Sequence, residues 1–244
     1  MTGVADGPDA AAGDHRTVAG RLASIRRGIG DACARVGRGP DDVVLIGAAK
    51  SVGMERITEA VAAGLTDIGE NRAADLAAKA PRLDRSITWH FLGKLQRGTV
   101  ARVAQHADVV HSAEPGRAVE RLAHRLEREG RTVRSLIEVD FTGRRQGVDP
   151  EHVIAFAEQL ARLPGLDVRG LMTVPPLSEH PEGPRPYFAR LRALRDRLIT
   201  VLPDAVELSM GMSADYIIAV EEGATMVRVG TAIFGPRPEP AAHT

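Results

Sequence analysis

The sequence Val-Val-Leu-Ile-Gly-Ala-Ala-Lys at residues 43–50 decides the fold of this chain. Apolar or small residues run without interruption into Lys50, which is typical of a parallel strand covered on both faces in an α/β protein. Functional side chains in such folds lie at the carboxyl ends of strands, where Lys50 falls. A lysine in an apolar mouth favours its neutral amine, which can condense with an aldehyde. This stretch alone equally allows a lysine that simply ends a strand in solvent.

Composition limits the classes of function. The chain has 244 residues, 43% hydrophobic and 26% charged, enough for one large barrel or two small domains. Lys plus Arg and Asp plus Glu both number 32, so no overall charge favours nucleic acid or an anionic membrane. The single Cys33 fits a reducing compartment, and no apolar run approaches the roughly 20 residues of a membrane span. We expect a cytoplasmic protein without nucleic-acid or membrane partners.

Hydrophobic periodicity predicts the element order. Residues 1–14 are expected to form a disordered leader, 15–237 one domain and 238–244 a tail, with an amphipathic helix from Thr17 before the first strand. The predicted strands are Val43–Lys50, Thr66–Gly69, Thr88–Leu92, Asp108–Ser112, Val133–Val139, Leu166–Thr173, Val206–Leu208 and Met226–Val229. The predicted helices are Met54–Ala63, Asn71–Lys79, Leu95–His106, Pro115–Glu129, Pro150–Leu163, Pro186–Val201, Ala214–Glu222 and a short element from Ala232.

Eight alternating units predict a single-domain (β/α)8 (TIM) barrel with an extra N-terminal helix. A doubly wound open sheet is the alternative. No G-x-G-x-x-G follows the first strand, which disfavours a dinucleotide-binding open sheet.

Two loops predict a phosphate site. In barrel enzymes a phosphate is often held after strands seven and eight, and here Ser209-Met210-Gly211-Met212-Ser213 and Gly230-Thr231 occupy those positions. Glycine lets the backbone approach an anion, and the hydroxyls of Ser209, Ser213 and Thr231 can donate to phosphate oxygens. Ordinary capping is the alternative, with Ser213 as the N-cap of the following helix.

Arg228 and Asn71 are further candidates. Arg228 shares one face of its strand with Met226, and an arginine inside a barrel is costly unless it meets a ligand or a carboxylate. We favour an inward, functional Arg228 over an outward salt bridge. Asn71 follows the second strand, so it either binds a ligand beside Lys50 or caps its own helix.

A strand-end lysine, a phosphate cradle and a buried arginine together describe a site for pyridoxal 5'-phosphate (PLP), a phosphate-bearing aldehyde with a pyridine nitrogen. Several ordered motifs, from about Thr17 to Arg237, resemble the pyridoxal phosphate homeostasis protein family. They are Ala48-Ala49-Lys50, Gly69-Glu70-Asn71, Trp89-His90-Phe91-Leu92-Gly93-Lys94-Leu95-Gln96, Gly170-Leu171-Met172-Thr173-Val174-Pro175, Leu208-Ser209-Met210-Gly211-Met212-Ser213 and Thr225-Met226-Val227-Arg228-Val229-Gly230-Thr231-Ala232-Ile233-Phe234-Gly235.

The resemblance implies a fold-type III PLP-binding barrel related to the N-terminal domain of alanine racemase. It implies a Schiff base on Lys50, a role in vitamin B6 homeostasis and no strong turnover. With it we expect the cofactor-binding residues Lys50, Asn71, Ser209, Ser213, Arg228, Gly230 and Thr231, no metal site, and a monomer whose partners are PLP and PLP-requiring apoenzymes. Two departures stand out: Ala49 replaces the usual serine or threonine, and Arg144-Arg145-Gln146-Gly147 replaces Ser-Lys-x-Gly.

Two enzyme classes are alternatives. An amino-acid racemase would use the same Schiff base but needs a second base, and the chain has only Tyr187 and Tyr216 as tyrosines, of which Tyr216 is expected to pack in the core. A class I aldolase would need carboxylates near the lysine, for which Glu138 and Asp140 are the candidates. We rank the aldolase last.

Overall fold

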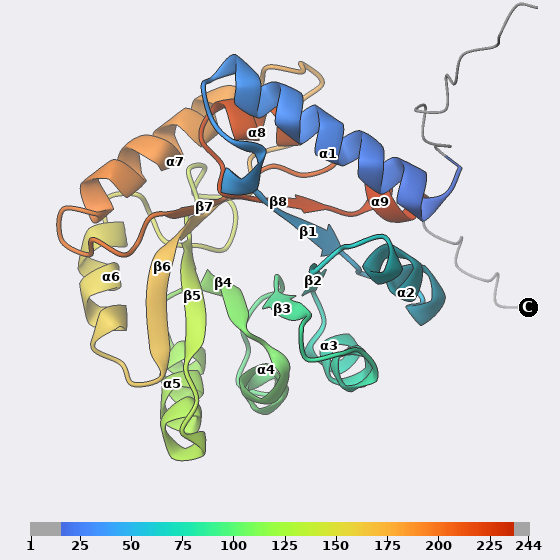
Figure 1. Cartoon of the computed structure of the whole chain (residues 1–244). Coiled ribbons are helices and arrows are strands. Elements are labelled where there is room, and N and C mark those ends of the chain that lie inside the picture. The colour runs from blue at the N-terminus through green and yellow to red at the C-terminus, as the bar shows by residue number, and fades with distance from the viewer. Residues whose placement is uncertain (1–15, 237–244) are drawn as a thin grey trace, which may run out of the picture.

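The computed structural model describes residues 16–236, so the expected leader (1–14) and tail (238–244) lie outside the described residues. Within that range eight strands pair in chain order, each parallel to its neighbours, and close into a barrel (Figure 1). The predicted (β/α)8 barrel is therefore confirmed. No helix in this range is long and apolar enough to cross a membrane.

The strands are short, as a barrel of this kind requires. Their bounds are β1 Val44–Ala48, β2 Asp67–Glu70, β3 Thr88–Phe91, β4 Val109–Ala113, β5 Val133–Glu138, β6 Leu166–Met172, β7 Glu207–Ser209 and β8 Met226–Val229. The α-helices are α1 Val18–Arg35, α2 Met54–Ala62, α3 Ala73–Lys79, α4 Val100–His106, α5 Arg117–Glu129, α6 Val153–Ala161, α7 Arg185–Leu198, α8 Tyr216–Glu221 and α9 Thr231–Phe234. Two short 3-10 helices are η1 Pro40–Asp42 and η2 Ala80–Arg82.

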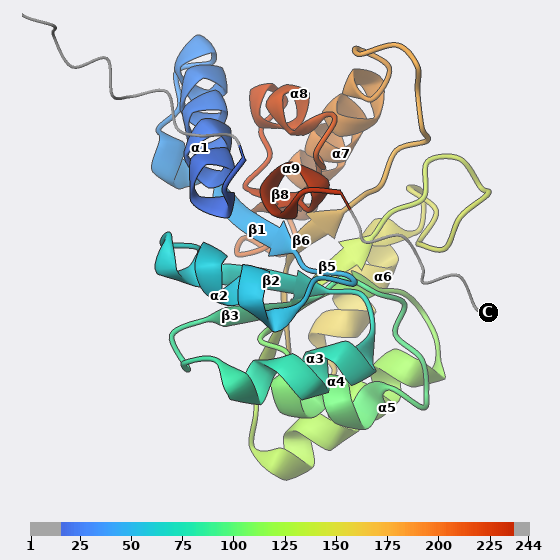
Figure 2. The ribbon, with the colours of Figure 1, turned by 90° about the vertical axis from the view of Figure 1, so that its right-hand side faces the viewer.

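The predicted N-terminal helix is α1. The Thr17 side chain caps it by accepting a hydrogen bond from Gly20 N at 3.0 Å. Its apolar stripe packs outside the barrel against α2, α8 and α9, and Figure 2 shows it alongside α8 and α9. The helix thus covers the seam where the last strand meets the first.

The largest boundary error concerns α4, which begins at Val100 and not at Leu95. The Thr99 hydroxyl donates to Gln96 O at 2.8 Å and accepts from Gln96 N at 3.1 Å, closing a turn before the helix. The sequence pattern did not distinguish this turn from a first helical turn because Leu95 is itself buried.

Apolar side chains cover both faces of the barrel sheet, the outer face toward the helices and the inner face toward the barrel axis. Most buried residues lie between the strands and the helices, whereas a smaller cluster of Ile46, Leu136, Met172 and Met226 fills the barrel interior. Interior positions elsewhere carry polar side chains, and these position the candidate site.

Candidate functional site

Lys50 follows β1 in a tight turn. Ala49 is fully buried and its N–H donates to Gly69 O at 2.8 Å, while Val52 N donates to Ala49 O at 3.0 Å. Ser51 takes a φ of 63°, an uncommon value for a residue with a side chain. The turn presents Lys50 at the carboxyl end of the barrel as expected. Lys50 is exposed, so of the two surroundings that the sequence left open the structure shows the solvent-exposed one.

A buried ion pair supports this turn. Lys79 of α3 pairs with the fully buried carboxylate of Glu70 and donates to Ala49 O at 3.1 Å. Burial raises the pKa of Glu70 although Lys79 opposes the shift. Glu70 Oε2 has no hydrogen-bond partner in the described part of the chain, and Ala49, whose carbonyl oxygen shares the Lys79 ammonium with Glu70, has no hydroxyl to offer it. The sequence did not lead us to predict this pair. One signal was present: Lys79 lies three residues after the buried Leu76, and residues at this spacing share one face of a helix.

Arg228 points into the barrel, as favoured. The residue is 5% exposed, and its guanidinium donates from Nη1 to Ser209 Oγ at 2.5 Å and from Nη2 to Thr173 O at 3.0 Å. Burial lowers the pKa of Arg228 to about 10, opposed by the nearby carboxylates of Asp215 and Glu138. The side chain therefore stays a cation at neutral pH.

The loops after β7 and β8 are joined by Ser213. Its Oγ accepts from Gly230 N at 3.2 Å and from Ala232 N at 3.3 Å. The expectation that Ser213 caps α8 is wrong, because Asp215 occupies the N-cap position and its Oδ1 accepts from Met212 N at 2.6 Å. The hydroxyl instead ties the β7 loop to the start of α9.

Gly230 and Thr231 lie beside the end of β1. A Cβ added at Gly230 would lie 3.0 Å from the carbonyl oxygen of Ala48, two residues before Lys50. Thr231 opens α9 and is exposed. The structure therefore places the end of β1, which leads into Lys50, beside the loop after β8 that is expected to hold a phosphate.

Ser209 is fully buried on β7. Its hydroxyl accepts the bond from Arg228 and lies 2.8 Å from His111 Nδ1. Both contacts lie in the barrel interior. The buried Ser209 hydroxyl is therefore engaged by Arg228 and His111, whereas the exposed Thr231 hydroxyl is accessible to a phosphate.

Asn71 follows β2, the neighbour of β1, and is exposed. Arg72 is the N-cap of α3, so Asn71 does not cap the helix. Its backbone is enclosed by Gly93, where an added Cβ would lie 1.9 Å from Asn71 O. Ser112 Oγ in turn donates to Gly93 O at 2.5 Å.

The two tyrosines considered as the second base of a racemase pack against other parts of the protein. Tyr216 packs on α1, with its hydroxyl 2.8 Å from where a Cβ on Gly28 would lie, and Tyr187 packs on Phe141 with ring centroids 6.4 Å apart. Burial raises the pKa of Tyr216.

The two carboxylates considered for an aldolase are also engaged. Glu138 accepts from Gln146 Nε2 at 3.1 Å, in the loop that departs from the family pattern. Asp140 accepts from Thr142 Oγ1 at 2.6 Å and from Arg145 N at 2.8 Å. Burial opposes the charged form of Asp140, but these bonds outweigh it and lower its pKa. Asp140 thus organises the loop after β5.

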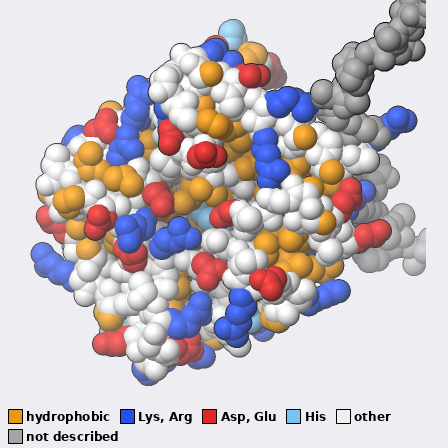
Figure 3. Space-filling view, viewed as in Figure 1, with side chains coloured by type: hydrophobic (Ala, Val, Ile, Leu, Met, Phe, Trp, Pro, Cys, Tyr) orange, Lys and Arg blue, Asp and Glu red, His pale blue; other side chains and the backbone are white. Residues whose placement is uncertain are grey.

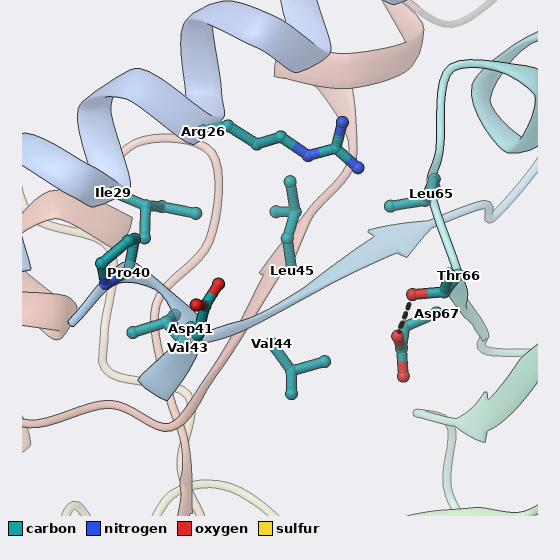
Figure 4. Close-up of a pocket in the computed structure, with 10 residues that line it drawn as sticks. All are labelled: Arg26, Ile29, Pro40, Asp41, Val43, Val44, Leu45, Leu65, Thr66 and Asp67. Atoms are coloured by element: carbon teal, nitrogen blue, oxygen red, sulfur yellow. Dashed lines mark hydrogen bonds between the residues drawn. The ribbon is translucent and has the colours of Figure 1, made fainter.

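A cavity of about 390 Å³ lies at the opposite end of the barrel, beneath α1 and the amino ends of β1 and β2 (Figure 4). Asp67 and Thr66 line it, and Thr66 Oγ1 donates to Asp67 Oδ2 at 2.7 Å. On the face drawn in Figure 3 basic and acidic side chains are interspersed. The expected chemistry lies at the other end, with Lys50.

The fold and the site first define a class. The family model described as alanine racemase, N-terminal domain, matches residues 32–238. Solved alanine racemases share the fold: that of Clostridium difficile 630 has a TM-score of 0.72 at 14% identity, covering 94% of this chain and 59% of that chain. The protein is therefore a lysine-bearing (β/α)8 barrel of the alanine racemase N-terminal type.

Nearer relatives define the family. The pyridoxal phosphate homeostasis protein of Aquifex aeolicus is 40% identical over 221 residues, which cover 89% of this chain and 97% of that protein. The structure of PipY from Synechococcus elongatus PCC7942 with PLP bound has a TM-score of 0.79 at 36% identity, covering 90% of this chain and 100% of that one. This chain belongs to the pyridoxal phosphate homeostasis protein family.

Proposed function

We propose that this protein binds PLP through a Schiff base between Lys50 Nζ and the cofactor's aldehyde, and that it keeps PLP available yet contained in the cell. One observation carries the proposal: Ala48, the last residue of β1 and two residues before Lys50, lies beside Gly230 at the start of α9, at the same end of the barrel as the Ser213 bridge. PipY, a relative with PLP bound, supports it.

The donors at this end of the barrel fit a phosphate-bearing pyridine aldehyde. Ser213, Gly230 and Thr231 would hold the phosphate, since Thr231 is exposed at the start of α9 and Gly230, which has no side chain, comes directly before it. Asn71 would contact the ring beside Lys50. Arg228 would face the pyridine nitrogen with an N–H not used by Ser209 or Thr173.

PLP supplies an electron sink when its pyridine nitrogen is protonated. Arg228 is a cation that can only donate, so it would leave that nitrogen unprotonated. The second base required for racemisation is also not supplied by Tyr216, which packs on α1. We therefore propose negligible racemase or transaminase turnover.

Titration with PLP tests the proposal. The unsubstituted protein should develop a visible absorbance that saturates with one PLP per chain, and Lys50→Ala should not. Lys94→Ala is the matched control, because Lys94 follows β3 at the same end of the barrel and pairs with Glu114 at 3.2 Å. Equal binding by the Lys50 and Lys94 variants would place the covalent linkage elsewhere.

We also propose that the protein acts as a cytoplasmic monomer that passes PLP to apoenzymes requiring it. Light scattering during size-exclusion chromatography should give the mass of one 26.1 kDa chain. A dimer mass would reject the monomer.

A further inference from the structure

A line of hydrogen-bonded side chains crosses the barrel interior from β2 to β8. Asp67 Oδ1 lies 2.9 Å from His90 Nε2, and His90 Nδ1 lies 2.9 Å from His111 Nε2. His111 Nδ1 lies 2.8 Å from Ser209 Oγ, which accepts from Arg228 Nη1. We name these five residues the interior relay. Both histidines are at most 1% exposed, so no bulk solvent competes with these bonds.

Asp67 and Arg228, at the two ends of the interior relay, determine which atom donates the proton in each of its hydrogen bonds. An ionised Asp67 only accepts, so His90 must carry its proton on Nε2. A neutral His90 then accepts at Nδ1, which requires a proton on His111 Nε2. His111 Nδ1 consequently accepts from the Ser209 hydroxyl. Arg228 only donates, so Ser209 Oγ must accept from it, and the two ends agree.

Burial of the two rings and hydrogen bonding to Asp67 favour these protonation states. Burial is the largest single influence on Asp67 and opposes its charged form, but the hydrogen bonds from His90 and Thr66 and the charges of His90 and Arg134 together outweigh it and lower the pKa of Asp67. Burial lowers the pKa of His90, and lowers that of His111 further below the usual range. The charged groups that act on the two rings are Asp67, Asp108, Arg134 and Arg228.

We propose that Asp67, His90, His111 and Ser209 are positioning residues that hold the Arg228 guanidinium in a single orientation. Two fixed bonds, to Ser209 Oγ and Thr173 O, define the plane of the guanidinium. Its remaining N–H groups are then aimed in fixed directions. Thr66 holds the other oxygen of Asp67, so the far end of the relay is anchored too.

The proposal rests on the proposed function for its consequence, since Arg228 matters to PLP only if PLP binds at this end of the barrel. The relay joins residues on five strands and reaches the cavity beneath α1 through Asp67. It therefore links the amino end of the barrel to the proposed pyridine contact.

The first test uses the protein without PLP. Side-chain nitrogen NMR should show both His90 and His111 as neutral rings protonated at Nε2, with slowly exchanging protons and no titration where an exposed histidine titrates. His124, whose side chain is 64% exposed, is the internal reference. A proton on Nδ1 of either ring, or a charged ring at neutral pH, would overturn the relay.

The second test substitutes the relay and measures PLP binding. His111→Phe removes the acceptor of Ser209 and should weaken PLP affinity on the order of tenfold and shift the visible spectrum of the complex. His111→Asn keeps an acceptor near the position of Nδ1 and should restore most of the affinity. Asp67→Asn should shift the spectrum, whereas Asp167→Asn, a carboxylate at the same end of the barrel that pairs with Arg169, should not.

The outcomes separate the two proposals. Loss of PLP binding by the unsubstituted protein would reject the proposed function while leaving the NMR test of the relay intact. Normal PLP binding with unchanged affinity and spectrum in His111→Phe and Asp67→Asn would reject the positioning role alone. Circular dichroism identifies a variant that fails to fold, in which case the NMR result decides.

Discussion

At Lys50 the backbone turns sharply, and the contact that restrains this turn comes from a neighbouring helix. Lys79 reaches Ala49 O from α3 while it neutralises Glu70, whose carboxylate is fully buried. A buried carboxylate left without its cation is strongly destabilising. The residue that would react is thus exposed, whereas the residues that hold it are not.

Lys79→Met should lower the free energy of unfolding at pH 7 by about 3 to 5 kcal/mol, because the buried Glu70 carboxylate loses the cation that pairs with it. Burial raises the pKa of Glu70 above 4.5, so the folded state binds this proton more tightly than the unfolded chain does. The carboxylate therefore costs stability as pH rises through this range, and the deficit should shrink as pH falls.

Urea unfolding at pH 7 and near pH 5 measures this deficit. Lys94→Met is the control, since Lys94 is 49% exposed and its pair with Glu114 should contribute less than about 1 kcal/mol. A deficit equal to the control, or one that grows as pH falls, would contradict a buried ion pair under Lys50.

At the scale of elements, the site depends on loops that touch one another. The loop after β3 presses Gly93 against Asn71, and the loop after β7 holds the start of α9 through Ser213. Each contact joins segments that belong to different β/α units.

Gly93→Ala should destabilise the protein by about 1 to 3 kcal/mol and weaken PLP binding, because the added Cβ would lie 1.9 Å from Asn71 O and backbone must move. Gly98→Ala in the same loop is matched, since nothing lies within 4 Å of its added Cβ. Thermal unfolding and PLP titration of both variants provide the comparison. Similar behaviour of the two would show that Asn71 is not held by this contact.

Ser213→Ala and Thr231→Ala should each weaken PLP binding by roughly 1 to 3 kcal/mol, the range for a lost hydrogen bond to a charged group. Only Ser213→Ala should also lower the free energy of unfolding, because it removes the acceptor of Gly230 N and Ala232 N. Unchanged PLP affinity in both variants would put the phosphate elsewhere.

At the scale of the whole molecule, the barrel could be predicted because strand burial and the alternation with helices are local properties of the sequence. The strand Met226–Val229 was predicted to the residue. Alternation placed Arg228 and Met226 on one face, and the position of Arg228 next to the glycine turn favoured the inward face that the structure shows. The approach of Gly230 to Ala48, two residues before Lys50, follows from closure of the barrel, since β1 pairs with β8.

The buried polar contacts could not be predicted, because their partners are far apart in sequence. His111 and Ser209 are 98 residues apart, and only the closed barrel brings them within a hydrogen bond. The sequence does place one histidine on each of two consecutive buried strands, His90 on β3 and His111 on β4. It does not reveal which way either side chain points or which groups it contacts. Ser213 shows the same limit. Its expected N-cap role was inferred from neighbouring residues, but in the structure its hydroxyl accepts hydrogen bonds from Gly230 N and Ala232 N in the loop after β8.

The most direct test of the central claim is borohydride reduction of the protein with PLP, followed by mass spectrometry of the intact chain and its peptides. A Schiff base on Lys50 predicts one phosphopyridoxyl group per chain, located on the peptide that contains Lys50, with none on the Lys50→Ala variant. A reduced protein that carries no such group, or carries it on Lys79 or Lys94 with Lys50 unmodified, would contradict the account.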